Sequence, residues 1–94
     1  MNLNVTSKPN SVCTVFHLHG KILTESDADK LNDAVSNLAT YKIIFSLKEL
    51  THINSTGIAV FIKTMTKCRI ENGDLLICEP NKMISKLFEI TKMN

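Results

Sequence analysis

Alternating strand-like and helix-like patterns limit most strongly how this sequence can fold. Residues 12–19, 41–47 and 74–78 are short runs rich in apolar residues, and each is followed by apolar residues at three- and four-residue steps. Strands and helices that alternate in this way connect by right-handed crossovers and build a partly parallel sheet with helices packed on it. The sequence therefore predicts an α/β fold with a mixed, mostly parallel β-sheet and amphipathic helices.

The first strand is predicted over residues 12–19, where alternate side chains share one face. Gly20 is expected to end it. A further strand over residues 2–8 is expected to pair antiparallel with it across a turn at Pro9 and Asn10. This hairpin would precede the first helix.

The first helix is predicted to begin at Thr24. Asp27 follows three residues later, so the pair resembles a capping box with Asp in place of the usual Glu. Apolar residues then recur at helical spacing and form one stripe that should face the sheet. This stripe consists of Ala28, Leu31, Val35 and Leu38.

Residues 41–47 form an apolar run that suits a strand buried on both faces, which is typical of a parallel or central strand. Residues 48–56 are predicted to be a turn region. The second helix is expected from about Gly57 to Arg69. Its inner stripe should contain Ile58, Phe61, Ile62, Met65 and Cys68.

The dipeptide Asn72-Gly73 is a strong signal for the end of the second helix. Residues 74–78 then predict another buried strand. Pro80 and Asn81 are expected to open a third helix. Its inner face should carry Met83, Ile84, Leu87 and Phe88.

Composition excludes several classes of function. The 94 residues suffice for one compact core, and 44% hydrophobic with 21% charged residues is an ordinary globular balance. The net charge is only +2 and basic residues form no run, so we expect no nucleic-acid binding. No apolar stretch approaches a membrane span, and the amino terminus lacks the pattern of a signal peptide. We therefore expect a cytoplasmic protein without direct membrane contact.

Neither the cysteines nor the histidines predict a metal site. Cys13, Cys68 and Cys78 are odd in number and lack CxxC spacing, which favours free thiols in a reducing compartment. His17 and His19 share one face of a strand, but no third ligand stands at a fixed spacing. We expect neither a metal nor a cofactor.

Catalysis is not expected either. Ser55 with His52 as a base would need an orienting acid and an oxyanion hole, and the strand–GxSxG–helix elbow is absent. The three glycines are isolated and form no phosphate-binding loop. The chain therefore reads as a binding protein.

The segment Asn54-Ser55-Thr56-Gly57 is the sharpest local feature, because small polar residues stand where the second helix begins. One interpretation is that these side chains only cap the helix. The other is that a phosphorylated hydroxyl here meets the positive helix end and adds about 1.5 to 2 negative charges to the surface. A partner docked over that charge would be repelled, which would make the hydroxyl a switch.

The ordered set of these segments resembles the STAS domain, and specifically the anti-sigma factor antagonists of bacteria. The resemblance covers about residues 11–90. Members of this family commonly continue with a further strand and helix, so residues 1–94 are expected to form a single STAS domain that lacks them. The matching segments are Phe16–Ile22, Ile43–Leu47, Asn54–Ile58, Asn72–Ile77 and Asn81–Phe88.

This resemblance implies a switch protein that frees a sigma factor by docking on its anti-sigma factor, an ATP-dependent serine kinase. The kinase phosphorylates the first serine of the family's Asp-Ser-Ser-Gly motif, and a serine phosphatase reverses the reaction. That serine corresponds to Ser55, with Thr56 as the second choice. The expected partner-binding residues are Lys21, Ile22, Leu23, His52, Asn54, Ser55, Thr56, Gly57, Ile58 and Phe61.

Three acidic positions of the family pattern are neutral here. Asn54 replaces the acidic residue before the phosphoserine, Ser46 replaces the Asp that ends a strand, and Leu23 stands where the pattern has Asp. An alternative is therefore a constitutive STAS subunit of a transporter or another multiprotein complex, without phosphorylation. An exposed sheet edge also allows a homodimer.

Overall fold

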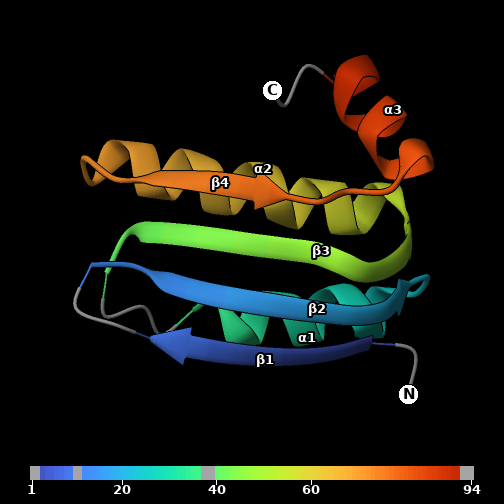
Figure 1. The fold of residues 1–94 in the computed structure, drawn as a ribbon, viewed down its shortest axis with the longest axis horizontal. Helices are drawn as coiled ribbons and strands as arrows, with labels where there is room; N and C mark the ends of the chain where they lie inside the picture. The colour runs from blue at the N-terminus through green and yellow to red at the C-terminus, as the bar shows by residue number, and fades with distance from the viewer. Residues whose placement is uncertain (1–2, 10–11, 37–39, 92–94) are drawn as a thin grey trace.

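The computed structural model describes residues 3–9, 12–36 and 40–91 and shows one four-stranded sheet with three helices. The strand order is β1-β2-β3-β4, with β1 antiparallel to β2 and the other pairs parallel (Figure 1). The predicted α/β architecture with a mostly parallel sheet is confirmed. The elements are β1 Leu3–Pro9, β2 Thr14–Ile22, α1 Glu25–Ala34, β3 Lys42–Ile53, α2 Ser55–Ile70, β4 Asp74–Cys78 and α3 Lys82–Thr91.

The amino-terminal hairpin forms as predicted, but its second strand is longer. Asn10 lies outside the described residues, so the turn itself is not described. Gly20 does not end β2: it lies within the strand at a φ of 101° and pairs with Leu3 on one side and Leu50 on the other. Glycine adopts this positive φ without steric cost, so the strand continues to Ile22.

The helices α1 and α2 lie on the same side of the sheet (Figure 1), and no helix of the described residues covers the other side. Along β3, Ile43, Phe45 and Leu47 are buried, whereas the intervening Ile44 and Ser46 are only half-buried. The prediction that residues 41–47 are buried on both faces is therefore wrong. Because only one face of the strand is covered, buried and half-buried residues alternate along it, as they commonly do in antiparallel sheets.

The central strand β3 is longer than predicted, because residues 48–53 continue it rather than form a turn. Its pairing with β2 shifts register twice, which places an extra residue in β3 each time. As a result Leu47, Leu50 and Ile53 are all buried although they are three residues apart. The two bulges keep the inner face apolar up to the start of α2.

Four phenylalanine rings connect the layers of the core. Phe16 of β2 lies 5.8 Å from Phe45 of β3, centroid to centroid, and Phe45 lies 4.9 Å from Phe61 of α2. Phe88 of α3 lies 5.9 Å from Phe61. These separations are within the range of favourable aromatic pairs, so the rings couple the sheet to both helices.

The first helix begins with the predicted capping box. Thr24 Oγ1 accepts from the Asp27 backbone N–H, and Asp27 Oδ2 accepts from the backbone N–H groups of Thr24 and Leu23. Ala28, Leu31 and Val35 are buried as expected. The helix ends at Ala34, and the predicted stripe residue Leu38 lies outside the described residues.

The inner stripes of the later helices are confirmed except at one position each. Ile62 of α2 is 42% exposed and Met83 of α3 is 44% exposed, so neither belongs to the core. The strand β4 has the predicted bounds but is an edge strand, with Leu76 57% exposed. The prediction of a buried strand there is therefore wrong.

Candidate functional site

The candidate site lies at the end of the sheet that is formed by the carboxyl termini of the parallel strands β2 and β3. Ile22 and Ile53 are register partners at this edge, and α1 and α2 begin directly after them. The amino termini of both helices are therefore brought together. They lie at the carboxyl ends of the parallel strands, which is where α/β proteins commonly bind their ligands. The segment around Ser55 opens α2 here.

Asn54 alone caps α2. Its Oδ1 accepts a hydrogen bond of 2.8 Å from the Gly57 backbone N–H, and its backbone is extended as expected of a cap. Ser55 and Thr56 are exposed, and within the described part of the chain their hydroxyls make no hydrogen bond. The capping function is thus assigned to Asn54, and the hydroxyl of Ser55 is left accessible on the first turn of the helix.

Gly57 fixes the start of α2 against the sheet. A Cβ atom at this position would lie 2.8 Å from Ile22 Cγ2 and 2.8 Å from Ile53 Cγ1, which is closer than side chains tolerate. The absence of a side chain lets the first turn of α2 approach the ends of β2 and β3. Ser55 is therefore held at a defined place on the surface.

The predicted partner-binding residues divide into an exposed and a buried group. Four of them are buried and cannot contact a partner directly, which corrects the prediction: Ile22, Gly57, Ile58 and Phe61. Asn54 is half-buried. The remaining residues are exposed and together form the surface that we call the switch face: Lys21, Leu23, His52, Ser55 and Thr56.

Within the switch face, β2 and β3 bring two residues side by side. Lys21 and His52 are register partners on neighbouring strands, and His52 Nδ1 lies 3.0 Å from the hydroxyl of Thr51. No carboxylate is hydrogen-bonded to His52 in the described part of the chain. The orienting acid that a serine nucleophile and histidine base would require is therefore not provided by these contacts.

Sequence reasoning missed a charged cleft beside the switch face. The cleft has a volume of about 260 Å³, lies between α1 and α2, and is lined in part by Thr56. Glu25 and Asp29 of α1 line it together with Lys63 of α2. The spacing of residues within each helix gave no signal for this cleft, because it forms only where α1 and α2 lie against each other.

Comparison with known proteins places the chain in a family. The sequence profile of the STAS domain matches residues 3–94. The chain belongs to the STAS domain family. It is also 29% identical over 93 residues to the anti-sigma-B factor antagonist of Bacillus subtilis (strain 168), which covers 97% of this chain and 84% of that protein.

Solved STAS structures share the fold at low identity. The Bacillus cell fate determinant SpoIIAA in its phosphorylated form superposes with a TM-score of 0.80, at 16% identity over 94% of this chain and 83% of that chain. Its unphosphorylated form gives a TM-score of 0.76, at 16% identity over 93% and 81%. These similarities support the same arrangement of strands and helices.

One departure from the family pattern lies away from the switch face. Ser46 was predicted to end a strand, but β3 continues to Ile53, so Ser46 stands in the middle of the strand. Ser46 lies seven positions before Ile53, about 20 Å along a strand. Ser46 pairs with His17 and Cys78 on neighbouring strands. The neutral residue at this position therefore does not alter the charge around Ser55.

The thiols and histidines of this STAS domain do not converge on a site. Burial raises the pKa of the Cys68 thiol above its usual value, which keeps it protonated in the core. His17 is half-buried and His19 is exposed on β2. Among residues 3–9, 12–36 and 40–91, no three His, Cys, Asp or Glu side chains are grouped closely enough to hold a metal.

The helices of the described residues are short or only partly apolar. None of them combines the length and the hydropathy that crossing a bilayer requires.

Asn54→Ala is expected to lower the free energy of unfolding by about 1 kcal/mol, because the cap of α2 is lost. Ser55→Ala is the matched control at the next position and is expected to stay within about 0.5 kcal/mol of the wild type, since its hydroxyl makes no cap bond. Urea unfolding followed by circular dichroism measures both. Equal losses for the two variants would show that Ser55 shares the capping function.

Proposed function

We propose that this STAS protein is an anti-sigma factor antagonist that is switched by phosphorylation of Ser55. In its unphosphorylated form it docks on an anti-sigma factor with serine kinase activity and so frees a sigma factor. The kinase transfers a phosphoryl group from ATP to the Ser55 hydroxyl, and a serine phosphatase removes it. The antagonist itself binds and is modified, and it carries out no catalysis. These partners would place it in the cytoplasm.

The observation that carries the proposal is that Asn54 caps α2, whereas Ser55, the next residue, does not. Because Asn54 Oδ1 caps α2, the neighbouring hydroxyl of Ser55 is exposed and free of a structural hydrogen bond in the described residues. A kinase can therefore reach this hydroxyl without unfolding the helix. The 29% identity to an anti-sigma-B factor antagonist supports the proposal that this protein is an antagonist of an anti-sigma factor.

Electrostatics explains how one phosphate would change the docking surface. At the first turn of α2 the phosphate meets unpaired N–H groups and the positive end of the helix dipole, so the helix tolerates it. It also adds about 1.5 to 2 negative charges at the residue before Thr56, which lines the adjacent cleft together with Glu25, Asp29 and Lys63. A partner selected for the unmodified surface would then face a concentrated negative charge and dissociate.

A second candidate function is a constitutive subunit of a transporter or another multiprotein complex. Asn54 and Leu23 are neutral where the family pattern is acidic, and this favours a partner that does not require the acidic groups. In that case the switch face would bind continuously and phosphorylation would play no part. The two candidates differ in the effect of a negative charge at residue 55.

Ser55→Asp is expected to weaken binding to the anti-sigma serine kinase of the same organism at least about tenfold, or roughly 1.4 kcal/mol. Isothermal titration with the wild type and the variant measures the effect. Thr66→Asp is the matched control, because it adds the same charge to an exposed position of α2 away from its first turn. It should bind like the wild type.

Incubation of the kinase with ATP gives the complementary test. The wild type should gain one phosphate by intact mass, and Ser55→Ala should gain none. Transfer to Thr56 in both proteins would move the switch by one residue. Binding that is equal for the wild type and Ser55→Asp, without phosphate transfer, would exclude the switch and favour the constitutive subunit.

A further inference from the structure

The two edges of the sheet are built differently. At the β1 edge, the exposed residues are polar, and Lys30 of α1 donates a 2.8 Å hydrogen bond from Nζ to the backbone carbonyl of Leu3. The β4 edge carries three apolar residues in its five: Leu75 is buried, Ile77 is half-buried, and Leu76 is 57% exposed. In the described part of the chain no strand lies on the outer side of β4. An apolar, unpaired edge of this kind is ready to pair with another strand.

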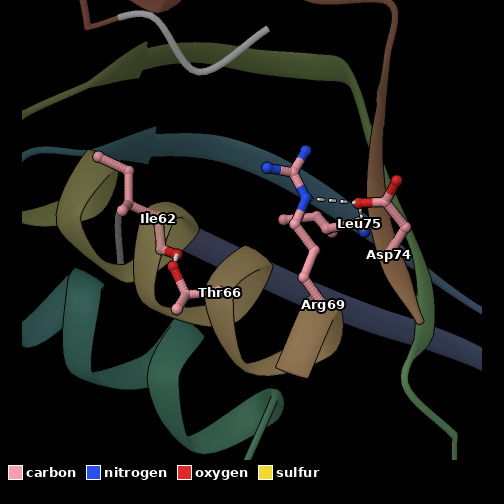
Figure 2. Close-up of polar contacts among 5 residues, drawn as sticks. All are labelled: Ile62, Thr66, Arg69, Asp74 and Leu75. Carbon is pink, nitrogen blue, oxygen red and sulfur yellow. Dashed lines mark hydrogen bonds and ion pairs between the residues drawn. The ribbon is translucent and has the colours of Figure 1, made fainter. Parts of the chain in front are cut away.

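A groove runs along the same edge on the helix side. It has a volume of about 240 Å³ and is lined by β4, by Met65 and Arg69 of α2, and by Ser85 and Phe88 of α3. Figure 2 shows Arg69 extending from α2 to Asp74 at the start of β4, where its Nε lies 3.2 Å from Asp74 Oδ1. The lining of the groove is therefore mixed: Met65, Phe88 and the apolar residues of β4 face it, and Arg69 with Asp74 lies at the end where β4 begins.

We propose that a second copy of this chain occupies the β4 edge, with the two β4 strands paired antiparallel about a two-fold axis at Leu76. This pairing places Leu75 opposite Ile77 of the other copy and brings the two Leu76 side chains together. It also keeps the helices of both copies on the same side, so the grooves beside the two strands adjoin. The proposal is independent of the switch at Ser55.

Charge complementarity selects the antiparallel direction. The start of β4, where Asp74 pairs with Arg69 of α2, then lies opposite the end of β4 in the other copy, where the exposed Glu79 follows Cys78. Asp74 stands opposite Cys78 of the other copy, and Glu79 adds a carboxylate at the end where Arg69 lies. Parallel pairing would place Arg69 and Asp74 opposite their own copies, and like charges directly opposite destabilise a strand pair. The Arg69–Asp74 pair is more than half exposed, so its rearrangement costs little.

The test is the mass of the 94-residue protein by light scattering, over concentrations from about 10 µM to about 1 mM that bracket a small interface. The wild type should approach twice its 10.5 kDa as concentration rises. Leu76→Lys places two like charges at the axis and should raise the dissociation constant at least about tenfold. Val12→Lys, at a similarly exposed apolar residue outside β4, should dimerise like the wild type.

A charge exchange separates the interface from the fold of one copy. Arg69→Glu should weaken the dimer, and the double variant that also carries Glu79→Arg should dimerise like the wild type. If Arg69→Glu acted only by breaking the Arg69–Asp74 pair within one copy, the second substitution would not restore the dimer. Circular dichroism confirms that each variant is folded. A wild type that stays monomeric at every concentration would overturn the proposal, and so would equal dimerisation of Leu76→Lys and Val12→Lys.

Discussion

Phe61→Ala is expected to lower the free energy of unfolding by about 3–5 kcal/mol, the usual loss for a buried phenylalanine. Phe61 is fully buried, and its ring contacts Phe45 of the sheet and Phe88 of α3. Removing it leaves a cavity between three elements that cannot all close around it. Because small domains are stable by only about 5–15 kcal/mol, this one change would remove a large share of the total.

The neighbouring residue gives a matched control for that experiment. Ile62 follows Phe61 on α2 but is 42% exposed, so Ile62→Ala should cost far less, within about 1 kcal/mol. Urea unfolding curves of both variants, with the wild type, measure the difference. If the two substitutions cost the same, Phe61 would not be the packing centre that joins the sheet to α3.

The sequence predicted most of the fold because hydrophobic spacing follows the geometry of each element. The strand over residues 74–78 and the capping box at Thr24 were placed correctly, since both are local signals. The second half of β3 was missed for a physical reason. Two bulges space Leu47, Leu50 and Ile53 three residues apart, and a pattern of three does not indicate a strand.

The candidate site was predicted in part. The start of α2 was located by its small polar residues, but sequence alone could not decide which of them caps the helix. The hydrogen bond from the Gly57 N–H to Asn54 Oδ1 assigns the cap. Ile22 and Phe61 were predicted to lie on the binding surface but are buried. The sequence could not decide this, because an apolar residue can face either the core or a partner. The cleft beside Thr56 depends on the contact between two helices, which spacing within one helix does not reveal.

Gly73→Ala is expected to destabilise the fold by about 3 kcal/mol, at the upper end of the usual cost of overpacking. A Cβ atom at Gly73 would lie 2.0 Å from the carbonyl oxygen of Tyr41, which belongs to the backbone and cannot rotate away. That same oxygen accepts a hydrogen bond from the Asp74 N–H at the start of β4. The methyl group would therefore push apart the first residues of β3 and β4.

Asn72→Gly is the control, because it tests the other residue of the same turn. Asn72 has a φ of 64°, a conformation that glycine adopts readily, so this variant should unfold within about 0.5 kcal/mol of the wild type. The Asn72-Gly73 signal thus divides into two functions: Asn72 reverses the chain after α2, and Gly73 makes room for Tyr41. Thermal unfolding followed by circular dichroism compares the variants. A large loss for Asn72→Gly with a small loss for Gly73→Ala would contradict this division, and β4 would then depend on the turn rather than on close backbone packing.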